Sequence, residues 1–164
     1  MAYSPLYIHS FPLLLPHNIT EAELFNITYT NPSQLASTAD RLRYYRYKKA
    51  LLQSEVSAYA EIDSGTYGSY EEGNRDYYPL DKLSKIAELL GVQMEDLLDD
   101  YNAFLSKGQS QLVKLLRQEL GMTRSEFATH FSVHLWNVKQ WERNKVRMSK
   151  MTWKNLFESR QKSS

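Results

Sequence analysis

The stretch VHLWNVKQWER, residues 133–143, decides the fold expected for this chain of 164 residues. Its first residue, Val133, is apolar. The next, His134, has a side chain that can accept a hydrogen bond from a backbone N–H that lacks a partner at a helix start. The stretch closes on a large aromatic residue and an acid, Trp141-Glu142. The pattern predicts a short helix behind a tight turn.

An earlier stretch, residues 62–72, repeats this pattern. The two align at an offset of 71 residues, since Gln53 falls on Arg124. Ile62-Asp63 takes the place of the apolar and capping residues, and Tyr70-Glu71 takes that of the aromatic–acid pair. Because turn, cap and aromatic–acid pair all occur twice, the sequence indicates a duplicated supersecondary unit.

The repeat extends upstream of both stretches. Residues 52–60, LQSEVSAYA, align with residues 123–131, TRSEFATHF. An arginine also lies 25 residues before the glutamate of each aromatic–acid pair, Arg46 before Glu71 and Arg117 before Glu142. The duplication therefore covers more than the two short helices.

Each unit resembles the lambda-repressor-like (XRE) helix-turn-helix family. In that family an arginine precedes Gly-Leu-Thr-Gln, a short helix with an apolar-Ala pair, Gly-Val-Ser, a recognition helix, Trp-Glu-x-Gly, a proline and a Leu-rich fourth helix. The first unit matches at Arg46, Gln53, Val56, Ile62, Thr66, Glu71, Gly73, Pro79, Leu83, Ile86, Ala87, Leu90, Gly91, Val92 and Leu97. The second matches at Arg117, Gly121, Thr123, Phe127, Ala128, Val133, Val138, Trp141 and Glu142.

The resemblance implies an all-α protein with two tandem helix-turn-helix bundles, the second shortened. We expect an N-terminal arm or packing segment over residues 1–37, an acidic first unit over 38–106 and a basic second unit over 107–164. Apolar spacing predicts a fifth helix in the first unit, over residues 94–105. The second unit has no fifth helix of its own, so either that helix or the N-terminal segment is expected to complete its packing.

The net charge of +1 conceals an uneven distribution. Residues 1–40 carry three acids and no Lys or Arg, and residues 41–107 carry 9 basic and 12 acidic residues. Residues 108–164 carry 11 basic and 4 acidic residues, a formal charge of +7. Such a segment attracts phosphate, although a solvated face or a surface that docks on an acidic protein has the same charge.

Composition excludes several classes of protein. The chain has no cysteine, so it has neither a disulfide framework nor a thiolate zinc site. It has no run of about 18 apolar residues that could cross a membrane, and its start lacks the basic residues of a signal peptide. We therefore expect a cytoplasmic protein.

The resemblance also implies roles for particular residues. The family's phosphate-positioning glutamine falls on Gln53 and Arg124. Its base-reading positions fall on Ser64, Gly65, Thr66 and Ser69 in the first unit, and on Leu135, Trp136, Asn137 and Gln140 in the second. Its backbone contacts after the recognition helix fall on Asn74, Arg75, Arg143, Lys145 and Arg147. The Arg46/Glu71 and Arg117/Glu142 pairs are implied to be structural ion pairs.

The two units differ as candidate DNA-binding surfaces. Asn137 and Gln140 carry amides that can pair with adenine, with Arg124, Lys139 and the cations after the helix available for phosphate. Trp136 cannot read a donor pattern and is either a stacking or an interface residue. The first unit has acids near the same surface and two helical glycines, each costing about 1 kcal/mol relative to alanine. It is a weak second DNA module, a dimerisation module or a partner surface.

Other chemistry has little support in the sequence. His130 and His134 have the spacing of a helical metal pair, but they lie on either side of the turn, so we expect no metal. No phosphate loop, nucleophile elbow or other catalytic pattern occurs, and we expect neither an enzyme nor a cofactor.

The sequence thus predicts a DNA-binding transcription regulator of the prokaryotic or phage type, such as a repressor. It would bind operator DNA mainly through the second unit. Either the two units of one chain occupy successive major grooves, or the protein forms a homodimer through the first unit. The alternative is a protein-interaction module, such as an antitoxin or adaptor, that contacts its partner through the N-terminal arm or the first unit.

Overall fold

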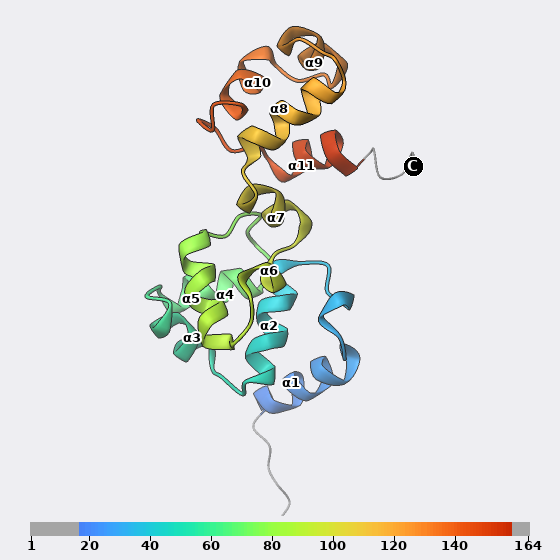
Figure 1. Cartoon of the computed structure of the whole chain (residues 1–164). Coiled ribbons are helices and arrows are strands. Elements are labelled where there is room, and N and C mark those ends of the chain that lie inside the picture. Colours follow the sequence, from blue (N-terminus) through green and yellow to red (C-terminus); the bar gives the residue numbers. More distant parts are fainter. Residues whose placement is uncertain (1–16, 159–164) are drawn as a thin grey trace, which may run out of the picture.

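The computed structural model of the chain describes residues 17–158 (Figure 1). These residues form helices and no strand, which confirms the all-α class. Of the N-terminal arm, residues 1–16 lie outside the described residues, whereas residues 17–37 form α1 and a 3-10 turn at Pro32–Gln34. The α-helices are α1 (His17–Thr28), α2 (Thr38–Lys48), α3 (Gln53–Tyr59), α4 (Ser64–Glu71), α5 (Leu80–Leu90), α6 (Met94–Leu97), α7 (Asp100–Ser106), α8 (Gln109–Glu119), α9 (Arg124–His130), α10 (Leu135–Trp141) and α11 (Lys150–Trp153).

Helices α4 and α10 begin where the sequence predicts, because each has a side chain that caps its first turn. The Asp63 carboxylate accepts a hydrogen bond from the Thr66 N–H at 2.8 Å. Nδ1 of His134 accepts one from the Trp136 N–H at 3.2 Å. Each helix follows a short turn from its predecessor, so α3–α4 and α9–α10 form equivalent helix pairs.

The backbone of the first unit is repeated in the second at the positions of unusual conformation. Positive φ angles, which non-glycine residues seldom adopt, occur after α2 and α8, after α3 and α9, and after α4 and α10. Each of these three positions in the first unit has its counterpart 71 residues later. The pairs are Ala50 and Gly121, Glu61 and Ser132, and Gly73 and Asn144.

Two clusters of buried residues form the cores. The first is built from α2 to α6 and ends at Leu98; the second begins at Tyr101 and ends at Leu156. Equivalent positions carry different apolar side chains, as where Tyr67 in the first core corresponds to Val138 in the second. The two bundles therefore share a backbone but not a packing pattern.

The prediction of one helix over residues 94–105 is wrong, because the chain breaks at Leu98 and Asp99. Both residues are extended, and the Asp99 carboxylate caps α7 by accepting a hydrogen bond from the Asn102 N–H at 2.8 Å. The Asp99 N–H itself donates to Thr38 Oγ1 at 2.9 Å. The break turns α7 toward the second unit.

Helix α7 completes the packing of the second unit, whose described residues, 107–158, contain no separate fifth helix after α11. Tyr101 and Phe104 lie in the second core. The ring centroids of Phe104 and Phe157 are 4.9 Å apart, and those of Tyr101 and Trp153 are 5.7 Å apart. Figure 1 shows α7 between the two bundles. Of the two segments expected to supply this packing, the structure places the C-terminal half of the predicted fifth helix there.

Candidate nucleic-acid interface

A buried ion pair joins the first helix of each unit to the end of its α4 or α10 segment. Arg46 Nε lies 2.6 Å from Glu71 Oε1, and these side chains are 8% and 2% exposed. Arg117 Nε lies 2.6 Å from Glu142 Oε1. Nη1 of each arginine also donates to a carbonyl oxygen at 2.9 Å, that of Leu51 or Met122. Each arginine thus ties three segments of its unit together.

The residues in the phosphate-positioning places, Gln53 and Arg124, join these ion pairs. Gln53 Nε2 donates to Glu71 Oε2 at 2.9 Å, and Arg124 Nε donates to Glu142 Oε2 at 2.6 Å. The Arg124 side chain remains 48% exposed, so it can hold the carboxylate and still face an anion in solvent. Gln53 lines a hollow of about 670 Å³ beside α1, together with the acid Glu23.

Because Arg117 and Arg124 both bind Glu142, the contribution of Glu142 to stability should depend on pH. Burial raises the pKa of Glu142, but hydrogen bonds from Arg117 and Arg124 outweigh it and leave this pKa below the ordinary value of 4.5. A carboxyl with a lowered folded-state pKa stabilises the fold above its unfolded pKa, and this contribution is lost as pH falls through the folded pKa. We expect Glu142→Gln to be less stable than the wild type at neutral pH.

Denaturant unfolding at a series of acidic pH values checks this expectation. The difference in free energy of unfolding between the wild type and Glu142→Gln should shrink as pH falls below 4.5. All other acidic residues are the same in both proteins, so the comparison isolates the effect of Glu142. A difference that stays constant with pH would contradict the role given to Glu142.

The outward side chains of α10 and of the following loop are open to a ligand. Asn137 and Gln140 are half-buried, whereas Lys139, Arg143 and Lys145 are exposed. Within residues 17–158, none of these five side chains forms a hydrogen bond or an ion pair. Two free amides are thus flanked by three free cations on one helix and its C-terminal loop. Trp136 lies on the same helix and is 53% exposed.

The equivalent hydroxyls of α4 already have partners in their own unit. Ser64 Oγ lies 3.3 Å from Ser57 Oγ, and the Thr66 hydroxyl donates to the Asp63 carboxylate. Ser69 Oγ donates to the Thr66 carbonyl at 2.7 Å and accepts from Arg75 Nε at 2.9 Å. The hydroxyls predicted to read bases in the first unit are therefore engaged internally, whereas the amides of Asn137 and Gln140 are free. Leu135, also predicted to read bases, packs against the second core.

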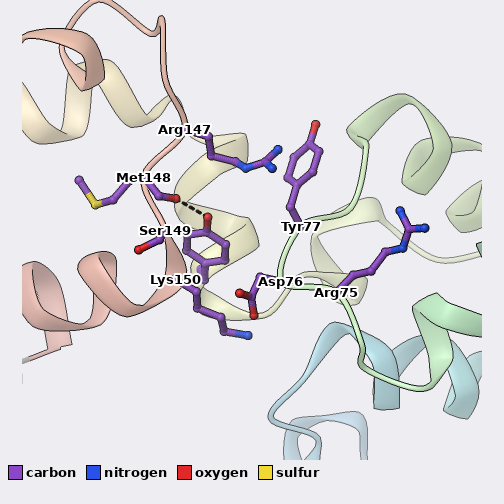
Figure 2. A pocket seen from close by; sticks show the side chains of 8 residues that line it. Arg75, Asp76, Tyr77, Arg147, Met148, Ser149 and Lys150 are labelled. Carbon is purple, nitrogen blue, oxygen red and sulfur yellow. Dashed lines mark hydrogen bonds between the residues drawn. The ribbon is translucent and has the colours of Figure 1, made fainter. Parts of the chain in front are cut away.

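Two of the predicted phosphate contacts, Arg75 and Arg147, line a hollow of about 470 Å³ between the units. Figure 2 shows Arg147 facing Tyr77 across this hollow, while Arg75 extends away from both. The Arg147 guanidinium carbon lies 3.8 Å from the centroid of the Tyr77 ring. No feature of the sequence pairs these two residues, because they belong to different units.

Comparison with models of protein families, with curated proteins and with solved structures found no match. The family of this chain is therefore not assigned, and the geometry of α10 and its loop carries the functional argument. Among the described residues, no cluster of three or more metal-binding side chains occurs. No helix within residues 17–158 is long and apolar enough to span a membrane.

Proposed function

We propose that the protein binds double-stranded DNA in a sequence-specific manner, chiefly through α10 of the second unit. The observation that carries this proposal is the pair of free amides, Asn137 and Gln140, flanked by the free cations Lys139, Arg143 and Lys145. The expected role is that of a cytoplasmic transcription regulator of the prokaryotic or phage type, in line with the resemblance to lambda-repressor-like proteins.

The chemistry of this surface suits the major groove. An α-helix fits that groove, and an Asn or Gln amide pairs bidentately with N6 and N7 of adenine. Lysine and arginine beside the helix neutralise phosphates, which fixes register and supplies most of the affinity. The formal charge of +7 over residues 108–164 acts in the same direction.

The first unit is the weaker candidate for base reading. The hydroxyls of Ser64, Thr66 and Ser69 bond within their own unit, and the acids Glu61 and Asp63 lie at the start of the same helix. DNA would have to break these hydrogen bonds before using the hydroxyls. A two-part DNA site could be bound by the two units of one chain. A homodimer that presents two copies of α10 is the competing arrangement.

Selection from a pool of randomised duplexes, followed by affinity measurements at several salt concentrations, tests the proposal. We expect an enriched motif and a steep fall of affinity with salt. A motif read by one α10 should be short, whereas a dimer should select two half-sites about 34 Å apart. Weak binding without an enriched motif would contradict the proposal and favour a protein-interaction role, in which exposed Trp136 contacts the partner.

Arg143→Ala should weaken binding to all duplexes by a similar factor. Arg143 is exposed and free of protein partners among the described residues, so its expected partner is a phosphate, which carries no base identity. The slope of log affinity against log salt should fall in magnitude by about one. Lys154→Ala removes the same charge outside α10 and its loop and should leave the slope nearly unchanged. If the two substitutions lowered the salt slope equally, Arg143 would act only through the overall charge of the protein and not through a specific phosphate contact.

A further inference from the structure

Two consecutive residues of α7 hold one loop of each unit. The Tyr101 hydroxyl donates to the Met148 carbonyl at 2.5 Å, in the loop between α10 and α11. Asn102 Nδ2 donates to the Asp76 carbonyl at 3.1 Å, in the loop between α4 and α5. Tyr101 and Asn102 are 2% and 1% exposed. Helix α7 therefore fixes the two loops side by side.

The loop after α10 is held at further points. The buried side chain of Gln109 donates from Nε2 to the Val146 carbonyl at 2.9 Å and accepts at Oε1 from the Met148 N–H at 2.6 Å. Lys150 Nζ lies 2.8 Å from Asp99 Oδ2. Hydrogen bonds thus hold the backbone on both sides of Arg147, and only the Arg147 side chain remains to be placed.

Tyr77 of the first unit places that side chain. The guanidinium carbon of Arg147 lies over the Tyr77 ring, 3.8 Å from the centroid, and Figure 2 shows the two side chains next to each other. Stacking uses the flat face of a guanidinium and leaves its N–H donors at the edge free for bidentate contact with an oxyanion. Arg147 pairs with no carboxylate among residues 17–158 and is exposed.

We propose that Tyr77 is a positioning residue for DNA binding, which holds the guanidinium of Arg147 ready to contact a DNA phosphate. This inference rests on the proposed function of the second unit. It gives the first unit a part in binding that requires no base reading: through Tyr77 it orders an arginine of the neighbouring unit. An arginine held in this way loses less side-chain freedom when it binds phosphate.

Four variants of the full chain, assayed on the duplex that the wild type selects, test this inference. Tyr77→Ala should weaken binding about two- to five-fold, as expected for the loss of a cation–π contact at an exposed site. Tyr77→Phe keeps the ring and should bind like the wild type. Arg147→Ala should weaken binding further and lower the salt slope by about one. Tyr77→Ala combined with Arg147→Ala should match Arg147→Ala alone, because Tyr77 acts only through Arg147.

Several outcomes would overturn the inference while leaving the proposed function intact. These are wild-type affinity in Tyr77→Ala, equal losses in Tyr77→Phe and Tyr77→Ala, or additive losses in the double variant. Tighter binding by Tyr77→Ala would also overturn it, since the ring would then withhold Arg147 from DNA. A wild type that binds no duplex overturns both proposals. Circular dichroism checks folding, and Tyr77→Leu replaces Tyr77→Ala if the alanine variant fails to fold.

Discussion

Replacement of Glu71 by alanine is expected to lower the free energy of unfolding of the first unit by about 3 to 5 kcal/mol, the usual cost of stranding one partner of a buried ion pair. Glu71 is 2% exposed and accepts two hydrogen bonds from Arg46, at 2.6 and 2.7 Å, and one from Gln53 at 2.9 Å. Without the carboxylate, the guanidinium of Arg46 stays buried with its charge uncompensated.

The distribution of aromatic residues allows this loss to be assigned to one unit. All three tryptophans, Trp136, Trp141 and Trp153, belong to the second unit, so tryptophan fluorescence follows that unit and far-ultraviolet circular dichroism follows the whole chain. In Glu71→Ala we expect the dichroism transition to shift to lower denaturant concentration, ahead of the fluorescence transition.

Two controls separate the ion pair from the loss of a side chain. Glu72→Ala removes the neighbouring, exposed glutamate and should change stability by less than about 0.5 kcal/mol. Arg46→Met together with Glu71→Ala removes both charges of the pair and should recover part of the loss. If Glu71→Ala were as stable as Glu72→Ala, the buried ion pair would make no important contribution to this fold.

Asn137→Ala and Gln140→Ala should each remove about 1 to 3 kcal/mol of discrimination at one base pair, the value of a good bidentate contact to adenine. Both amides are free within the described part of the chain, so no internal hydrogen bond has to be broken first. The measurement compares affinities for the selected duplex and for duplexes with single base-pair changes. The variants should lose preference at one position and keep it elsewhere.

Ser64→Ala and Ser69→Ala are the matched controls in the first unit. Their hydroxyls lie on α4 at hydrogen-bonding distance from Ser57 and Thr66, so their removal should leave base preference unchanged. Equal losses of discrimination in the two units would overturn the proposed asymmetry and make the first unit a second reading module.

The duplicated helix pairs could be predicted because their signals are local. A cap and an aromatic–acid pair lie within about ten residues of each other, and each helix start depends on a contact such as that between Asp63 and the Thr66 N–H. The break at Leu98 and Asp99 could not be predicted in this way. Apolar residues continue at helical spacing across it. The hydrogen bond that competes with a continuous helix is donated by the Asp99 N–H to Thr38, 61 residues away.

In the candidate interface too, the local features could be predicted from the sequence and the long-range contact could not. The free amides of α10 lie at positions that the family resemblance indicates, whereas the contact between Tyr77 and Arg147 depends on how the two units pack. A contact between one ring and one guanidinium leaves no periodic pattern in the sequence. The neighbouring residues Tyr101 and Asn102 form no sequence pattern that would indicate it either. Such a contact is found only when the arrangement of the units is known.

The paired positions of positive φ bear on the history of the chain. From Ala50 to Gly73 and from Gly121 to Asn144, the three constrained positions have the same spacing, so the two units align here with no net insertion or deletion, as a duplication followed by substitution would leave them. Glycine occupies one member of two pairs and neither member of the third. The two halves of the chain thus act as an internal alignment, in which the retained backbone and the exchanged side chains can be compared position by position.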